Sequence, residues 1–356
     1  ESELTNKIQQ EIHLPTMTLD GRVIELQLNS GLSAGFECPE NLDALGIGLY
    51  RTEIPFMDRH CFPSEHEQTK LYEKILAKFP QKPVTMRTLD VGGDKSLPYF
   101  PIIEDNPFLG WRGIRITLDH PEIFLVQVRA MIRANKYHKN LEIMLPMISN
   151  VNEVDEATRL INQAYFEVRN ELDTEAKSEA VSDNDDTFIN HNVQLPRPKI
   201  GIMLEVPSVI FQLKELAHRV DFFSVGSNDL TQYLLAVDRN NAQVASLHDA
   251  YHPAVLRALN LIAEQSAQFL VPLSLCGELA GEPAGALLLL AMGFDKLSMN
   301  GHNIARIKWV IRHVEFKRAK IILSHTLKLT TAKHVHSYLN EQLEQLGLGG
   351  FIRAGM

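Results

Sequence analysis

Two carboxylates and an amide follow short apolar runs, at positions where side chains bind ligands rather than fill a core. Asn228 and Asp229 come just after one such run, and Glu205 comes directly after the run before it. Carboxylates at the ends of neighbouring strands are typical ligands of a hard divalent cation, which binds one or two of them together with substrate oxygens and water. Arg239 follows closely and indicates an anionic group beside that cation. The spacing therefore predicts a Mg²⁺ or Mn²⁺ site next to a bound anion.

Each carboxylate also has a structural interpretation. Glu205 could favour the start of a helix through the helix dipole, and Asp229 could be the N-terminal cap of a helix that begins near Leu230. Either explanation is plausible for one residue alone. The presence of both carboxylates at successive strand ends favours the metal.

Further cations lie at the ends of other predicted strands or shortly after them. Two guanidiniums that converge on one pocket suit a phosphate or a carboxylate. The alternative is structural ion pairing, with Glu53 and Asp90 as partners of two of these arginines. The cations are Arg51, Arg87, Lys95 and Arg112.

Cys276 ends another apolar run, and we expect it to face the same pocket. A thiol has an ordinary pKa of about 8.5, which suits a proton donor at neutral pH, although a cysteine is more often a small core residue. Cys38 and Cys61 lack this placement. The fourteen histidines show no metal-site spacing, and we expect those such as His248 to be surface or packing residues.

The positions of these residues predict the fold. Eight short apolar runs each end in polar or charged residues, and amphipathic stretches at helical spacing separate them. This order is typical of a parallel (β/α)₈ TIM barrel, in which functional residues stand at the carboxyl ends of the strands. The predicted strands are 23–28, 47–50, 84–89, 142–145, 200–204, 222–225, 273–275 and 296–299.

The barrel is expected to fill residues 17–315, after a polar lead-in or linker at 1–16 and before a C-terminal helical extension at 316–356. A polar, acidic stretch at 173–195 is expected to form a disordered or surface excursion. Because the chain begins with Glu1 rather than Met, we also expect a domain upstream.

Composition narrows the functional classes. The formal net charge is -9, and without a dense basic stripe it argues against nucleic-acid binding. No apolar run approaches the ~20 residues of a membrane span. Three cysteines without paired spacing indicate a reducing, cytoplasmic location.

Several long motifs resemble the phosphoenolpyruvate-binding domain of enzyme I, which starts the bacterial phosphoenolpyruvate:phosphotransferase system. The related barrel of pyruvate phosphate dikinase is similar. Residues 51–57 and 227–235 look most like the nitrogen-branch enzyme I. The stretches that carry the resemblance are 46–53, 87–95, 106–112, 201–205, 221–239 and 276–281.

The resemblance implies a role for each candidate residue in a phosphoenolpyruvate/pyruvate-binding barrel. Phosphate would be held by Arg51, Arg87 and Arg239, with Lys95 and Arg112 adding positive charge. Glu205 and Asp229 would hold Mg²⁺, and Asn228 would bind the substrate. Cys276 would protonate the methylene carbon of enolpyruvate, which then leaves as pyruvate. A homodimer is also implied.

One departure from the family limits the expected activity. The family's phosphoryl acceptor is a histidine within a Gly-Gly-x-x-Ser-His pattern of an upstream domain, and this chain has no such pattern. The chain is therefore expected to be the donor half of a phosphotransferase that acts through that domain on a histidine phosphocarrier protein. Two alternatives stay open: a Mg²⁺-dependent pyruvate-enolate lyase or aldolase, and a non-catalytic phosphoenolpyruvate-sensing dimerisation module.

Overall fold

Eight parallel strands form a closed barrel in the computed structural model, which describes residues 8, 10–31, 44–182 and 194–350. Every strand pairs with the next along the chain, and β1 closes the ring against β8 with Leu28 opposite Met299. This confirms the predicted TIM barrel. The strands are β1 (Glu25–Ser30), β2 (Ile47–Arg51), β3 (Val84–Arg87), β4 (Leu141–Leu145), β5 (Lys199–Leu204), β6 (Phe222–Val225), β7 (Leu273–Leu275) and β8 (Lys296–Met299).

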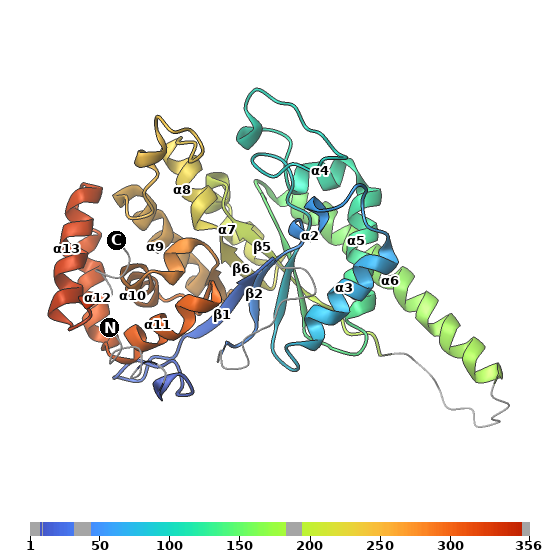
Figure 1. The fold of residues 1–356 in the computed structure, drawn as a ribbon, viewed down its shortest axis with the longest axis horizontal. Coiled ribbons are helices and arrows are strands. Elements are labelled where there is room, and N and C mark those ends of the chain that lie inside the picture. The colour runs from blue at the N-terminus through green and yellow to red at the C-terminus, as the bar shows by residue number, and fades with distance from the viewer. Residues whose placement is uncertain (1–7, 9, 32–43, 183–193, 351–356) are drawn as a thin grey trace.

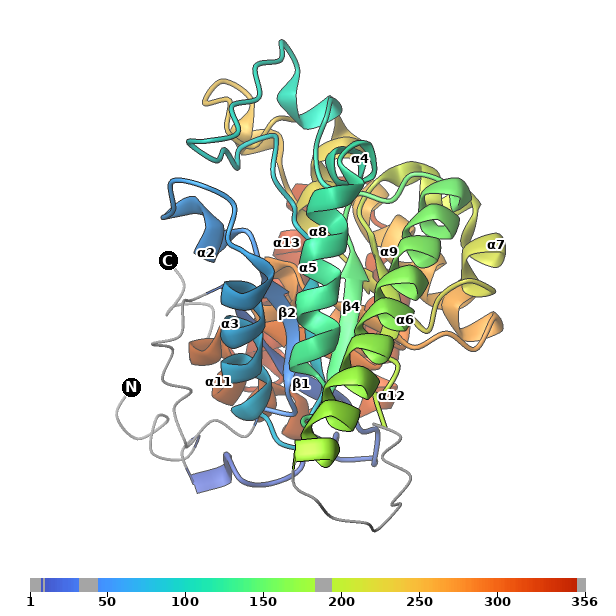
Figure 2. The ribbon, with the colours of Figure 1, turned by 90° about the vertical axis from the view of Figure 1, so that its right-hand side faces the viewer.

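Helices surround the strands (Figures 1 and 2). No helix in the described part of the chain is long and apolar enough to cross a membrane. The α-helices are α2 (Ile54–Met57), α3 (Glu65–Ala77), α4 (Ile114–Asp119), α5 (Pro121–Ala134), α6 (Val151–Ser182), α7 (Leu213–Ala217), α8 (Ser227–Leu235), α9 (Pro253–Gln268), α10 (Pro283–Met292), α11 (Gly301–Arg312), α12 (Phe316–Thr326) and α13 (Ala332–Gln345).

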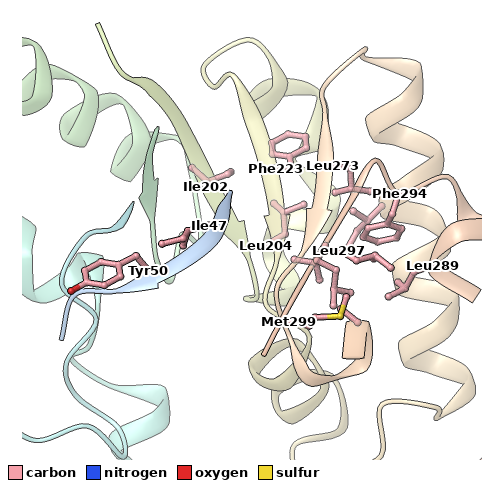
Figure 3. Packing of buried hydrophobic residues seen from close by; sticks show 14 of the residues in the cluster. Ile47, Tyr50, Ile202, Leu204, Phe223, Leu273, Leu289, Phe294, Leu297 and Met299 are labelled. Carbon is pink, nitrogen blue, oxygen red and sulfur yellow. The ribbon is translucent and has the colours of Figure 1, made fainter. Parts of the chain in front are cut away.

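The main core lies between the strands and the surrounding helices. Figure 3 shows Leu297 of β8 near Leu289 of α10, and Leu204 and Phe223 of β5 and β6 in the same core. Successive side chains of a strand point to opposite faces, so residues that alternate with these point into the barrel. The apolar strand runs are explained by this arrangement, because parallel strands in a barrel are covered on both faces.

The excursion expected at 173–195 is only partly correct. Helix α6 continues to Ser182 and extends beyond the barrel in Figure 1, so the first part of this stretch is helical. Glutamates of α6 form ion pairs with arginines of α5, including Arg133 with Glu175 at 3.3 Å, and these contacts support the added turns. Residues 183–193 lie outside the described part of the chain.

The segments before β1 and after β8 pack on the same side of the barrel. Lys308 of α11 is buried and donates a hydrogen bond to the carbonyl oxygen of Ile12 at 2.7 Å, while Arg312 pairs with Glu11 at 3.0 Å. Helix α12 packs against α10. These contacts anchor both segments to the barrel.

Candidate active site

A cavity of about 740 Å³ opens at the carboxyl ends of the strands. Residues that follow most of the strands line it, as expected for a barrel enzyme. All but one of the site residues expected from the sequence lie here. Those in the wall are Arg51, Arg87, Lys95, Glu205, Asn228, Asp229, Arg239 and Cys276.

Glu205 is fully buried directly after β5. Its Oε1 accepts a hydrogen bond from the backbone N–H of Met147 at 2.7 Å, whereas its Oε2 is buried without a partner among the described residues. Burial, followed by the charges of Asp229 and Asp90, raises the pKa of Glu205 to about 7. A buried carboxylate oxygen without a partner is costly, and a cation beside it would remove that cost.

Asp229 lies in the first turn of α8. The N-cap position belongs to Gly226, and no side chain caps this helix, so the cap interpretation of Asp229 is wrong. Its Oδ1 is 3.3 Å from Nη1 of Arg112 and 3.5 Å from Nη1 of Arg239. Glu205 and Asp229 thus face one cavity from β5 and α8.

The carboxylates present fit a metal ion whose remaining coordination positions are filled by water and substrate. Within the described ranges, no group of three or more histidines, cysteines or carboxylates could hold a metal ion by itself. Mg²⁺ commonly binds one or two carboxylates and fills its other positions with water and substrate phosphate. Glu205 and Asp229, with one unpartnered oxygen, match that requirement.

Arg87 and Lys95 share two buried carboxylates. Arg87 pairs with Glu53 and, at 3.2 Å, with Asp90. Lys95 lies 2.5 Å from Asp90 and 3.6 Å from Glu53. Burial opposes the charge of Arg87, but these carboxylates outweigh it, and its pKa is raised. The structural pairing considered for Arg87 is therefore present, and it holds a permanently charged guanidinium at the cavity wall.

Arg112 does not lie in the cavity wall. It is completely buried, with Nη2 3.4 Å from Asp90 and Nη1 3.3 Å from Asp229. Its Nη1 also lies 3.3 Å from the hydroxyl of Tyr233. The structure therefore places Arg112 behind the cavity, with its donors on two carboxylates rather than in the wall.

The glycine-rich turn after β3 packs against Arg112. Gly92 has a φ of +100°, and a Cβ there would lie 2.5 Å from the Cβ of Arg112. Glycine is therefore required for protein packing.

Arg51 differs from the other cations. It ends β2, is exposed and lines the cavity, yet it forms no ion pair with any residue that the structure describes. Arg239 follows α8 and pairs with Asp229 at 3.5 Å and with Asp94 at 3.6 Å. Both arginines are accessible to an anion in the cavity.

Cys276 is buried directly after β7, and its thiol lies 3.5 Å from the carbonyl oxygen of Val225. Leu49, Met144 and Met203 pack around it. Burial raises the pKa of the Cys276 thiol to about 11. The thiol therefore keeps its proton at neutral pH, as a proton donor must. Cys61 is exposed, and Cys38 lies outside the described residues.

Among the wall residues without a role in the interpretation of the sequence are His248 and Asn29. His248, expected at the surface or in packing, lines the cavity with Nε2 2.9 Å from the carbonyl oxygen of Asn228. Asn29 lies near the end of β1 and also lines the cavity. Asn29 follows an apolar run, and this position could have indicated that it lines the cavity. No comparable feature of the sequence lies near His248.

Fold and cavity together define a TIM-barrel protein with a cavity at the carboxyl ends of its strands, lined by both cations and carboxylates. The family of PEP-utilising enzymes, described by its PEP-binding domain, matches residues 5–316. The chain belongs to this family. PEP stands for phosphoenolpyruvate.

Curated relatives agree with this assignment. A Salmonella typhimurium protein named "Phosphoenolpyruvate-dependent phosphotransferase system" is 49% identical over 100% of this chain and 45% of its own length, and an Escherichia coli protein of the same name has the same values. A Haemophilus influenzae phosphoenolpyruvate-protein phosphotransferase is 40% identical over 93% of this chain and 54% of its own length. The chain thus spans about half the length of the relatives it matches.

Proposed function

We propose that the chain is the phosphoenolpyruvate- and Mg²⁺-binding catalytic domain of a phosphoenolpyruvate-protein phosphotransferase. The observation that carries this proposal is the convergence on one cavity of Arg51, Arg87 and Arg239 with Glu205 and Asp229. Positioning and charge neutralisation do most of the work in phosphoryl transfer, and this set of groups supplies both. The names of the relatives support the same activity.

The arginines serve as the phosphate clamp. Arg51 at the end of β2 and Arg239 after α8 would contact the phosphate, Arg87 would add charge from the wall, and Lys95 shares Asp90 with Arg87. Asn228 binds the substrate at the start of α8. Several cations around the transferring group stabilise the charge that it carries in the transition state.

Glu205 and Asp229 would hold Mg²⁺, and Mn²⁺ is chemically acceptable. The metal would neutralise phosphate charge and orient the substrate. Arg112 contributes indirectly, because its pairing with Asp229 fixes one of the two carboxylates.

The bond between phosphorus and the bridging oxygen breaks, and its electron pair stays on that oxygen as enolate. The phosphoryl group passes to a histidine nitrogen of an upstream domain. Cys276 then donates the thiol proton to the methylene carbon, and the enolate becomes the ketone of pyruvate. The resulting thiolate takes a proton from water.

The greater length of the relatives supports a separate acceptor domain, and through it a histidine phosphocarrier protein. We assign the chain to the nitrogen branch on the motifs at 51–57 and 227–235. A cytoplasmic homodimer completes the proposal.

A transfer assay tests the proposal. The chain is mixed with Mg²⁺, phosphoenolpyruvate labelled at phosphorus and a separately produced upstream histidine domain. Label on that domain supports the transferase. Binding of phosphoenolpyruvate without transfer would favour the sensing module, whereas the absence of Mg²⁺-dependent binding would refute the proposal.

A further inference from the structure

Asn29 connects two strands that are not neighbours in the barrel. Its Nδ2 donates a hydrogen bond to the carbonyl oxygen of Cys276 at 2.8 Å, and its Oδ1 accepts one from the hydroxyl of Ser298 at 2.6 Å. Ser298 belongs to β8, which lies between β1 and β7. Asn29 thus reaches past β8 to the residue that follows β7.

The hydrogen bond from Asn29 to Cys276 takes the place of a backbone hydrogen bond between β7 and β8, whose pairing stops before Cys276. The pairing of β7 with β8 ends at Leu275, opposite Leu297, one residue before Cys276. On its other side, Cys276 donates its backbone N–H to the carbonyl oxygen of Val225 at 3.1 Å. The carbonyl of Cys276 is therefore held by a side chain, and a buried carbonyl without such a partner would be costly.

The chain is confined on the far side of Cys276 as well. A Cβ at Gly277 would lie 1.8 Å from Oγ of Ser227, so the backbone passes very close to the start of α8. The N–H of Cys276 is hydrogen-bonded to β6, its carbonyl accepts from Asn29, and Gly277 packs against the start of α8. The backbone of Cys276 is therefore fixed. That backbone fixes the direction of the Cα–Cβ bond, and the thiol lies 3.5 Å from the carbonyl oxygen of Val225.

We propose that Asn29, oriented by Ser298, positions Cys276 so that the thiol proton reaches the methylene carbon of bound enolpyruvate. Asn29 exchanges no proton itself. This inference rests on the proposed function, in which Cys276 is the proton donor. In that step the S–H bond breaks with its electron pair left on sulfur, and the enolate electrons form the new C–H bond.

The amide is well suited to this task. It offers a donor and an acceptor from one planar group, so its NH₂ faces the carbonyl of Cys276, which can only accept, while its oxygen accepts from the hydroxyl of Ser298. An aspartate at position 29 would direct an oxygen at the carbonyl of Cys276 and repel it. Misplacement of a reacting group by about 1 Å can cost about 100-fold in rate.

Solvent exchange of pyruvate tests the inference on the full chain without an acceptor domain. In D₂O with Mg²⁺ and inorganic phosphate, the Cys276 thiolate removes a proton from the methyl group of pyruvate. After exchange with solvent, the thiol returns a deuteron. The loss of the methyl proton signal, followed by NMR, gives kcat and KM for the exchange.

Asn29→Ala is expected to lower kcat about tenfold or more, with KM for pyruvate and affinity for phosphoenolpyruvate changed less than about twofold. Ser298→Ala should act in the same direction but less, and Asn29→Asp should be no better than Asn29→Ala. Rates are divided by the number of sites that bind phosphoenolpyruvate, so that a loss of folded protein is not counted. Asn260→Ala, on the exposed side of α9, is the matched control, and Cys276→Ala gives the background.

The two proposals fail in different ways. A kcat for Asn29→Ala within about twofold of the unsubstituted chain, with exchange abolished in Cys276→Ala, would overturn the positioning role alone. A parallel loss of phosphoenolpyruvate affinity would also overturn it, because Asn29 would then act on binding. If the unsubstituted chain shows no exchange, the donor role of Cys276 fails and the inference fails with it. The absence of phosphoenolpyruvate binding would refute the proposed function itself.

Discussion

The guanidinium of Arg112 lies 3.3 Å from the carboxylate of Asp229, and the two residues meet behind the cavity rather than inside it. Arg112 also reaches Asp90, which pairs in turn with Arg87. Arg87 completes the series by its ion pair with Glu53. An alternating chain of buried charges thus connects a candidate metal ligand to the candidate phosphate site.

Replacement of Arg112 by alanine should mainly affect stability. It removes the buried partner of Asp229 and one of the cations around Asp90, and breaking a buried pair in this way costs about 3–5 kcal/mol. Urea denaturation measures the change in the free energy of unfolding. Arg115→Ala is the control, because Arg115 contacts backbone carbonyls nearer the surface and should cost about 1 kcal/mol. Equal losses for the two variants would contradict the buried role of Arg112.

Arg51→Ala should weaken substrate binding or transfer and leave stability almost unchanged. Because Arg51 forms no ion pair within the described part of the chain, we expect little change in the melting temperature. Phosphoenolpyruvate binding or transfer should weaken by about 2–4 kcal/mol, the scale for the loss of one electrostatic stabiliser. Calorimetry with Mg²⁺ present measures the affinity, and Arg59→Ala, paired with Glu67 at the surface, is the control. Unchanged affinity and rate would make Arg51 a structural residue.

The raised pKa of Glu205 predicts that a rise in pH lowers the stability of the metal-free chain but increases its stabilisation by Mg²⁺. Its pKa rises from 4.5 to about 7 in the folded chain, so the folded chain binds a proton more tightly than the unfolded chain. The contribution of this protonated group to the free energy of unfolding is lost as the pH rises through about 7. Mg²⁺ needs the ionised carboxylate, so the rise in melting temperature caused by Mg²⁺ should be larger at pH 8 than at pH 6.

Glu205→Gln tests both effects, because glutamine cannot ionise. The variant should lose the Mg²⁺-dependent rise in melting temperature and this part of the pH dependence. Thermal unfolding with and without Mg²⁺ across this pH range is the measurement. A Mg²⁺ effect that persists in Glu205→Gln would show that the ion binds elsewhere.

Cys276→Ala should separate binding from proton transfer. The side chain is small and lies among Leu49, Met144 and Met203, so the variant should fold and bind phosphoenolpyruvate. Pyruvate formation, measured by coupled oxidation of NADH in the presence of an acceptor domain, should slow. Normal turnover would remove the acid role of Cys276.

The raised pKa of Cys276 also predicts low reactivity. The thiolate is the nucleophile in alkylation, and a buried thiol with a pKa of about 11 has very little of it at pH 7.5. Iodoacetamide should modify the exposed Cys61 well before Cys276, as followed by mass spectrometry of tryptic peptides. Faster modification of Cys276 would imply an activated thiolate and a different mechanism.

The barrel and most of the residues around its cavity could be predicted from the amino-acid sequence. Apolar periodicity is a local property, and a strand buried on both faces appears as a continuous apolar run. The polar residue at the end of each run, such as Glu205 or Cys276, then has only one end of the barrel to occupy. The polar stretch from residue 173 did not indicate a helix, yet α6 continues to Ser182, and Glu175 within it pairs with Arg133 of α5.

The pairing of these side chains could not be predicted from the sequence. Arg51 and Arg112 look equivalent in the sequence, yet one reaches the cavity and the other is enclosed by carboxylates. Likewise, the link from Asn29 to Cys276 joins residues 247 positions apart. The physical reason is that a charge or an amide is defined by its partners and its burial. Those are set by loops from separate strands that meet at one end of the barrel.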